Sequence, residues 1–266
     1  MTSNLNDIDE LLNKHYNETS DGLVDASPSR LTTGQGTEKN FYILKIDLVG
    51  STMMLAGSRK TTYLRLAHTF LSTVDKITQE RGADSEQTEY AGDSVLAYFP
   101  ENISAENVLV AACLCRMAVI RIAELHGAIG ALKPRCKVVL HYAPLIVAKI
   151  GPRAGSFISA IGHPIHRVAY IEKQIGADTG RTTEEFYKQL ALVNRKFLTE
   201  VNVTRQEEIP SYQLPRVYPN SSLGLANILK GNTVSAMPSP PQYKTINTLV
   251  GYDIKWGFLN RLLNLI

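Results

Sequence analysis

The stretch "FYILKIDLVGST", residues 41–52, places two charges inside an apolar run that ends in a Gly-Ser-Thr turn. Side chains alternate along a β-strand, so the apolar residues at even positions from 42 to 48 share one face. Lys45 and Asp47 lie on the opposite face, and Asp47 stands next to the end of the strand. We therefore expect the even face to pack against helices and the two charges to point away from them.

The turn that follows this strand comes before a predicted helix. It consists of Val49, Gly50, Ser51 and Thr52. Consecutive backbone N–H groups in such a turn are suited to holding phosphate oxygens.

A second carboxylate follows in the hairpin pattern "SEQTEYAGDSVLAYF", residues 85–99. Asp93 occupies the Gly-Asp turn of this hairpin, and Glu89 lies on the same side of the strand four residues earlier. A single aspartate is more often a turn or capping residue than a ligand. If the hairpin lies beside the first strand, however, Asp47 and Asp93 converge, and paired carboxylates favour Mg²⁺ or Mn²⁺ bound with a nucleoside triphosphate.

The alternation of periodic segments predicts the fold class. Predicted strands are Tyr42–Leu48, Ser85–Ala91, Ser94–Phe99, Cys136–His141, Leu145–Ile150 and a last one at residues 212–218, and predicted helices are Lys60–Glu80, 103–127, 164–175 and Thr183–Val201. The first six elements follow the ferredoxin-like βαββαβ order. This order predicts an α+β fold, with helices on one face of a mainly antiparallel sheet.

Composition divides the chain into three parts. Residues 1–40 combine a short helical segment with a flexible polar linker, and residues 41–218 form the predicted folded domain. Residues 219–266 form a turn-rich C-terminal extension that ends in "YDIKWGFLNRLLNLI", an amphipathic helix by its spacing. That helix either docks on the domain or contacts a partner or a membrane surface.

Charge and cysteine content exclude several classes of protein. The 266-residue chain has a net charge of +3 without a block of like charges, so no nucleic-acid partner is expected. Cys113, Cys115 and Cys136 show no metal-type spacing and are expected to be reduced, buried thiols. The polar N-terminus is unlike a signal peptide, and the apolar run at residues 108–123 is too short to span a membrane. A cytoplasmic location is expected.

Four motifs in order resemble the class III nucleotidyl cyclase catalytic domain. "FYILKIDLVGST" is similar to the family's first strand and metal aspartate, and "EYAGDSVLAYF" to its second metal motif. "CKVVLHYAPLIVAKIG" and "SAIGHPIHRVAYIEK" are similar to two later family segments. The resemblance covers about residues 41–175.

The resemblance implies a two-metal mechanism. Asp47, Asp93 and the carbonyl of Leu48 would hold two divalent ions, Mn²⁺ or Mg²⁺, while the Val49–Thr52 turn binds phosphates. The ribose 3′-hydroxyl would attack the α-phosphate and expel pyrophosphate, which gives a 3′,5′-cyclic nucleotide. Family members build their sites across a head-to-tail interface, so a homodimer is expected.

Two residues depart from the family pattern. His166 replaces the asparagine that orients the ribose, and Tyr170 replaces the arginine that stabilises the transition state. These residues are i, i+4 on one helix face and either line the site or pack at the dimer interface. Lys45 is a candidate for the missing positive charge; the alternative is that its ammonium only reaches toward solvent at the sheet end.

Two further positions in the family read the base. Adenylyl cyclases carry lysine and aspartate or threonine there, whereas this chain has Glu89 and Ser159. A carboxylate only accepts hydrogen bonds, which suits the N–H groups of guanine or uracil and disfavours adenine. Mismatched buried polar groups discriminate strongly between bases.

In these departures from the family pattern, the chain resembles the pyrimidine cyclases of Pycsar antiphage systems. That resemblance implies UTP as the favoured substrate, cUMP as the product, and a separately encoded effector that senses the cyclic nucleotide. Uracil suits Glu89 better than cytosine, whose N3 is an acceptor. The alternatives are a guanylyl cyclase in ordinary signalling and a non-catalytic module that binds nucleotide.

Overall fold

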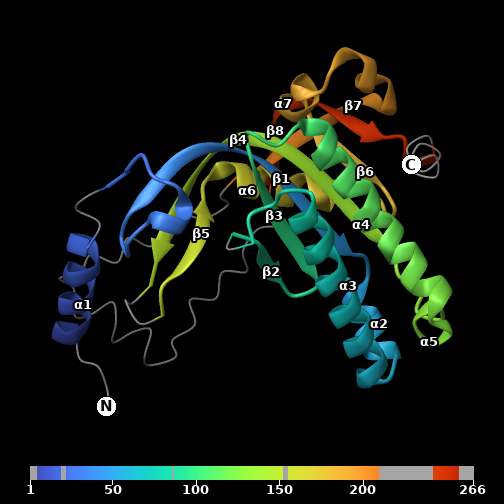
Figure 1. Ribbon diagram of the computed structural model, residues 1–266, viewed down its shortest axis with the longest axis horizontal. Coiled ribbons are helices and arrows are strands. Elements are labelled where there is room, and N and C mark those ends of the chain that lie inside the picture. The colour runs from blue at the N-terminus through green and yellow to red at the C-terminus, as the bar shows by residue number, and fades with distance from the viewer. Residues whose placement is uncertain (1–4, 19–21, 86, 152–154, 210–241, 258–266) are drawn as a thin grey trace. The chain divides into compact units, whose positions relative to one another are not determined.

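The computed structural model describes residues 5–18, 22–85, 87–151, 155–209 and 242–257 (Figure 1). The described residues contain eight strands that form one sheet: β1 (Gly36–Leu48), β2 (Glu89–Ala91), β3 (Ser94–Pro100), β4 (Cys136–Ile150), β5 (Phe157–Ile161), β6 (Gly180–Thr183), β7 (Leu198–Ile209) and β8 (Gln242–Ile254). The strand order is β2-β3-β1-β4-β6-β8-β7, with β5 also paired to β4. The helices are α1 (Leu5–Glu18), α2 (Ser51–Gly57), α3 (Lys60–Glu80), α4 (Ala105–Leu125), α5 (Gly127–Gly130), α6 (His163–Gln174) and α7 (Glu184–Gln189).

The predicted βαββαβ core is confirmed. Strands β1, β2, β3 and β4, with α3 and α4 between them, give the antiparallel order β2-β3-β1-β4. β1 is central, since it pairs along most of its length with β4 and over seven residues with β3 (Figure 1). The observed fold is therefore α+β with a mainly antiparallel sheet, as the element order predicts.

Helices α3 and α4 cover the even face of β1. Cys115 of α4 lies near Cys136, which pairs with Leu48 on that face. The α4 helix begins where the Ser104 side chain accepts a hydrogen bond from the Asn107 backbone at 3.2 Å. The buried stripe of α3 comprises Leu66, Phe70, Val74 and Thr78, whereas Leu64 is exposed.

The odd face of β1 is also covered by a helix. Val168 and Ile171 of α6 pack in one buried cluster with Ile43, Tyr98 and Val139. The sequence predicts helices on one face of the sheet only; α6 departs from this prediction, because its apolar residues pack on the opposite face from α3 and α4. Lys45 and Asp47 thus face away from α3 and α4 as predicted, but they lie on the side where α6 packs.

The break predicted in "CKVVLHYAPLIVAKIG" is wrong, because β4 is one continuous strand. On its second edge, β4 pairs with β6 at residues 138–140 and with β5 at residues 146–150. Pro144 falls between these two pairings. Its missing N–H therefore interrupts neither of them, which is where proline is tolerated in a strand.

The helix predicted at Thr183–Val201 is also wrong in extent. Thr183 ends β6 and caps the short helix α7, accepting a hydrogen bond from the Phe186 backbone at 3.4 Å. A 3-10 helix, Leu192–Phe197, follows, and β7 begins at Leu198. The apolar residues of this segment therefore belong to several short elements and do not form one face of a single helix.

The C-terminal segment contributes a strand. Residues 252–254, predicted as the start of an amphipathic helix, belong to β8, and Ile254 is buried. Gly251, Tyr252 and Asp253 pair antiparallel with β6. The strand predicted at residues 212–218 and the helix predicted beyond residue 257 lie outside the described residues.

The chain divides into two compact units, residues 1–201 with 251–266, and residues 202–250. The first unit contains the βαββαβ core, α6 and the pairing of β6 with β8. The predicted boundaries at residues 40 and 218 stay predictions. β1 itself begins at Gly36, and Leu31 is already buried.

The state of the cysteines and the length of the apolar helices are also predicted from composition. All three cysteines are buried free thiols, as predicted. Within the described part of the chain, no helix is both long enough and apolar enough to cross a membrane.

We predict that Gly180→Ala destabilises the first unit. A Cβ at Gly180 would collide with the Trp256 ring and come within 2.9 Å of Ile254. Overpacking of this kind costs about 1–3 kcal/mol, measurable by urea unfolding. Gly57→Ala is the matched control, because its new Cβ meets no atom within 4 Å. Equal stability of the two variants would mean that Trp256 does not pack against β6.

Candidate active site

Asp47 and Asp93 converge at one end of the sheet, as the sequence predicts. Asp47 is paired with Ser94 in the register of β1 and β3. The backbone N–H of Leu48 donates to the carbonyl of Asp93 at 3.4 Å. These pairings bring the turn of the β2–β3 hairpin beside the last residues of β1.

The two carboxylates repel one another in a partly desolvated setting. Burial, followed by the charges of Asp93 and Glu172, raises the pKa of Asp47 to about 6. Lys45 and Lys137 oppose this shift. The Oδ2 atom of Asp93 is buried and has no hydrogen-bond partner among the residues that the structure describes. A divalent cation would relieve both penalties, so these residues fit one.

The donor set suits Mg²⁺ or Mn²⁺ more than a soft metal. Among the described residues, no group of three or more His, Cys, Asp or Glu side chains is placed to hold an ion. Two carboxylates and the carbonyl of Leu48 are hard oxygen ligands. Hard ions held by few carboxylates complete their coordination with water and substrate phosphates.

The turn after β1 is only partly available for phosphate. Gly50 has φ 74°, a conformation that glycine adopts without strain, and α2 begins at Ser51. The N–H of Val49 donates to the carbonyl of Arg135 at 2.8 Å. The predicted phosphate contacts therefore fall to Gly50, Ser51 and Thr52.

Lys45 belongs to a buried charge cluster with Lys137 and Glu172. Glu172, 8% exposed, receives the Lys45 ammonium at 3.4 Å and the Lys137 ammonium at 3.2 Å. Lys137 also donates to the Glu172 carbonyl at 3.1 Å. Lys45 therefore neither reaches freely into the site nor extends to solvent. Its charge acts on Asp47 from within the cluster.

Glu172 and Lys137 are not among the site residues predicted from the sequence. A signal for Glu172 was present, because it lies on the same face of α6 as Val168, Ile171 and Ile175. An acid on an apolar helix face requires a partner when that face is buried. Lys137 had no comparable signal, since only the β1–β4 register places it opposite Asp47.

Tyr63 of α3 is a third residue that the sequence did not indicate. Burial, and then the charge of Asp93, raise the pKa of its hydroxyl, which lies beside Ser51. This places a phenol next to the carboxylate pair and the turn.

His166 and Tyr170 lie on the outward face of α6. His166 is exposed and Tyr170 is half-buried, whereas Val168 and Ile171 face the sheet. The shared face predicted for the two residues is thus consistent with their burial. Within one chain, that face turns away from the sheet surface that carries Asp47.

A second ion pair holds α6 near its N-terminus. Arg167 donates to Glu185 at 2.7 Å, and Glu185 lies beside the buried His141. His141 hydrogen-bonds through Nδ1 to the Thr183 hydroxyl at 2.8 Å. Burial and the Arg167 charge lower the pKa of His141 to about 4, so the ring is neutral near pH 7. Together with the buried charge cluster, this pair fixes the orientation of α6.

Glu89 and Ser159, predicted to read the base, are adjacent. The Ser159 hydroxyl donates to Glu89 Oε1 at 3.2 Å, and the Ala160 backbone N–H donates to the same oxygen at 3.1 Å. Burial and the charge of Glu89 raise the pKa of Tyr98 nearby. The β2–β3 hairpin and β5 therefore assemble this pair, although 70 residues separate its members.

Solved structures that are similar in fold to this chain include nucleotide cyclases. A guanylyl cyclase, Cya2, matches with a TM-score of 0.58 and 13% identity, over 82% of this chain and 93% of that one. The adenylyl cyclase CyaB from P. aeruginosa matches with a TM-score of 0.53 and 14% identity, over 82% and 95%. The chain has the fold of a class III cyclase domain.

A third neighbour is described differently. A class III adenylyl cyclase-like ATP-binding protein from Pseudomonas aeruginosa has a TM-score of 0.56 and 14% identity, over 72% of this chain and 45% of that one. No protein-family model matches the chain, and no curated protein matches it. At these identities the likeness establishes the class III fold alone.

We predict that Glu172→Gln destabilises the protein by about 2–4 kcal/mol, because it leaves two largely buried lysines without their carboxylate. Chemical unfolding measures the loss. Glu80→Gln is the control, since its pair with Lys76 is exposed and contributes under about 0.5 kcal/mol. The double variant with Lys45→Met should recover part of the loss. If Glu172→Gln and Glu80→Gln unfold alike, the buried charge cluster contributes nothing to stability.

Proposed function

We propose that the chain is a nucleotide cyclase that converts UTP to 3′,5′-cyclic UMP and pyrophosphate. The observation that carries the proposal is the convergence of Asp47 and Asp93 beside the turn after β1, on a class III cyclase fold. The new bond joins the ribose 3′-oxygen to the α-phosphorus. The bond that breaks joins the α-phosphorus to the oxygen that leaves with pyrophosphate.

The chain's own residues divide the work. Asp47, Asp93 and the Leu48 carbonyl would hold two Mg²⁺ or Mn²⁺ ions, which supply polarisation of the α-phosphate and a lower pKa for the 3′-hydroxyl. Gly50, Ser51 and Thr52 would position the phosphate oxygens through their backbone N–H groups. Lys45 and Lys137 offset part of the mutual repulsion that keeps the pKa of Asp47 high.

The outward placement of His166 and Tyr170 supports a homodimer. In one chain these residues cannot approach Asp47, because Val168 and Ile171 of the same helix face the sheet. In a head-to-tail pair, α6 of one copy would present them to the carboxylates of the other. There, His166 would orient the ribose and Tyr170 would hydrogen-bond to a phosphate oxygen.

The environment of Glu89 favours uracil over guanine. Two protein donors, Ser159 and the Ala160 N–H, already use Oε1, so Oε2 is the oxygen left for the base. Uracil offers one donor at N3, whereas guanine offers two adjacent donors that suit a carboxylate with both oxygens available. Adenine offers an acceptor at N1, which a carboxylate repels.

The biological role we propose is second-messenger synthesis in antiphage defence. It rests on the resemblance to Pycsar pyrimidine cyclases, and it implies a separately encoded effector that senses cUMP. The chain would act in the cytoplasm as a homodimer. The alternatives are an ordinary guanylyl cyclase and a non-catalytic module, the latter favoured by the departures at His166 and Tyr170.

The test is incubation of the purified chain with each of ATP, GTP, CTP and UTP in the presence of Mn²⁺, followed by chromatographic separation of products. We expect cUMP as the main product. Formation of cGMP alone would establish the guanylyl cyclase alternative. Absence of any cyclic product at high protein concentration, where dimers form, would support the non-catalytic alternative.

Asp47→Asn should abolish cyclic nucleotide formation without weakening the fold. The folded-state pKa of Asp47, about 6, exceeds the ordinary 3.8, so the charged form is the one that folding disfavours. Its contribution to stability therefore falls as pH rises through about 4 to 6, and removing the charge helps near pH 7. We expect a melting temperature equal to or above that of the wild type. Retained activity would refute the metal assignment.

Glu89→Lys should depress the use of UTP and GTP more than that of ATP. An ammonium donates where the carboxylate accepts, and losing a matched hydrogen bond costs about tenfold or more in kcat/KM. The readout is the ratio of products from mixed triphosphates. Ser85→Lys, an exposed position before the same hairpin, controls for added charge. An unchanged ratio in Glu89→Lys would exclude a base-reading role.

A further inference from the structure

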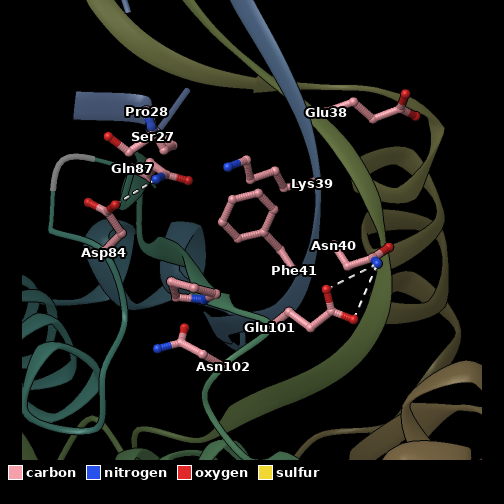
Figure 2. Close-up of a pocket in the computed structure, with 11 residues that line it drawn as sticks. Ser27, Pro28, Glu38, Lys39, Asn40, Phe41, Asp84, Gln87, Glu101 and Asn102 are labelled. Atoms are coloured by element: carbon pink, nitrogen blue, oxygen red, sulfur yellow. Dashed lines mark hydrogen bonds between the residues drawn. The ribbon is translucent and has the colours of Figure 1, made fainter. Parts of the chain in front are cut away.

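A cavity of about 790 Å³ lies beside the first half of β1 (Figure 2). Asp47 lies near the other end of that strand. Four parts of the chain contribute to the walls of the cavity: the N-terminal segment (Ser27, Pro28), β1 (Lys39, Phe41), the loop before β2 (Asp84, Gln87) and the end of β3 with the residues after it (Pro100, Glu101, Asn102). The volume is within the range of sites for small organic molecules. None of the residues assigned to nucleotide, metal or base contacts lines this β1-start cavity.

Gln87 gives the β1-start cavity an unsatisfied acceptor. The residue is 1% exposed, and its Nε2 donates to Asp84 Oδ2 at 2.6 Å. A carboxylate accepts hydrogen bonds only, so this contact fixes which end of the amide is oxygen. The Oε1 atom is buried without a partner, and Figure 2 shows it directed toward the space above Phe41. It needs a donor that the described residues do not supply.

Lys39 brings a donor to the same space. Its side chain extends above Phe41 with the ammonium directed toward the side where Gln87 lies (Figure 2). Its pair with Asp25, at 3.4 Å, joins a half-exposed lysine to a 98% exposed carboxylate and is easily exchanged. Phe41, 2% exposed, and Pro100 give the cavity an apolar floor.

The charged residues that line the β1-start cavity are three carboxylates, Glu38, Asp84 and Glu101, and one ammonium, Lys39, so an anion is disfavoured. Hydrogen bonds to Gln87 and Lys39 do not require a charge on the ligand. Glu101 is already engaged on the far side, where it accepts from Asn40 at 3.3 Å and from the Tyr142 hydroxyl at 2.5 Å. A ligand of the β1-start cavity therefore has to offer one hydrogen-bond donor to Gln87 and one acceptor to Lys39.

We propose that the β1-start cavity binds a small neutral molecule with an amide edge. Its N–H donates to Gln87 Oε1, and its adjacent carbonyl accepts from the Lys39 ammonium, while its apolar side rests on Phe41 and Pro100. Two sources offer that chemistry, the ring lactam of a nucleobase and a primary carboxamide. The site does not depend on the proposed cyclase activity.

Titration calorimetry with uracil and with nicotinamide separates the two sources. The third probe is 1,3-dimethyluracil, which keeps the ring and both carbonyls but has no N–H. We expect saturable binding of uracil or nicotinamide with a Kd at or below about 1 mM, and at least about tenfold weaker binding of dimethyluracil. Whichever of the first two probes binds more tightly identifies the source.

Substitutions at the β1-start cavity test whether the probes bind there. Ser27→Trp fills the rim of the β1-start cavity and should abolish binding, whereas Ser29→Trp adds the same ring outside it. Both substitutions remove the contact between the two serine hydroxyls, so they are matched. Gln87→Met should weaken binding about tenfold by removing the acceptor. Absence of saturable binding, equal affinity for dimethyluracil, or equal binding by the two tryptophan variants would overturn the proposal.

Discussion

The antiparallel pairing of β1 with β3 and β4 is the constraint on which the rest of the structure depends. Because β1 is central, its register determines which side chains meet at both ends of the sheet. At one end, Asp47 opposes Ser94, and Asp93 follows from the tight turn. A one-residue slip would exchange the two faces of β1 and move Lys45 and Asp47 into the layer under α3 and α4. The hydrophobic pattern of β1 therefore specifies the carboxylate pair along with the fold.

A central strand covered on both faces cannot carry charges without partners. Lys45 is such a charge, and the Glu172 carboxylate of α6 pairs both with it and with Lys137 of β4. The same contacts tie α6 to β1 and β4. Burial of ionic groups in this way contributes more to a unique arrangement than to net stability. The proposed active site depends on that arrangement, because α6 carries His166 and Tyr170.

Much of the fold and part of the site could be predicted from the sequence. Helices α3 and α4 and the core strands have strong periodicity, and the convergence of Asp47 with Asp93 follows from the βαββαβ order. The strand break predicted at Pro144 is wrong. A proline interrupts a strand only where a neighbouring strand would accept a hydrogen bond from its N–H, and that depends on pairings with residues distant in the sequence. Strand β8 and Lys137 were missed for the same reason, since nothing local in the chain shows which strand becomes their neighbour. Glu172 differs from these, because the local sequence shows it as an acidic residue on an apolar helix face.

The electrostatics of Asp47 connect stability to function. A carboxylate with a pKa near 6 is disfavoured in its charged form by folding, yet only that form binds a divalent ion well. The protein therefore maintains a local penalty, which binding of a divalent cation at the proposed site would relieve. Lys45 and Lys137 set the size of that penalty. Without them the pKa of Asp47 would lie still higher. Lys45 thus contributes to the charge balance around Asp47 while it is paired with Glu172.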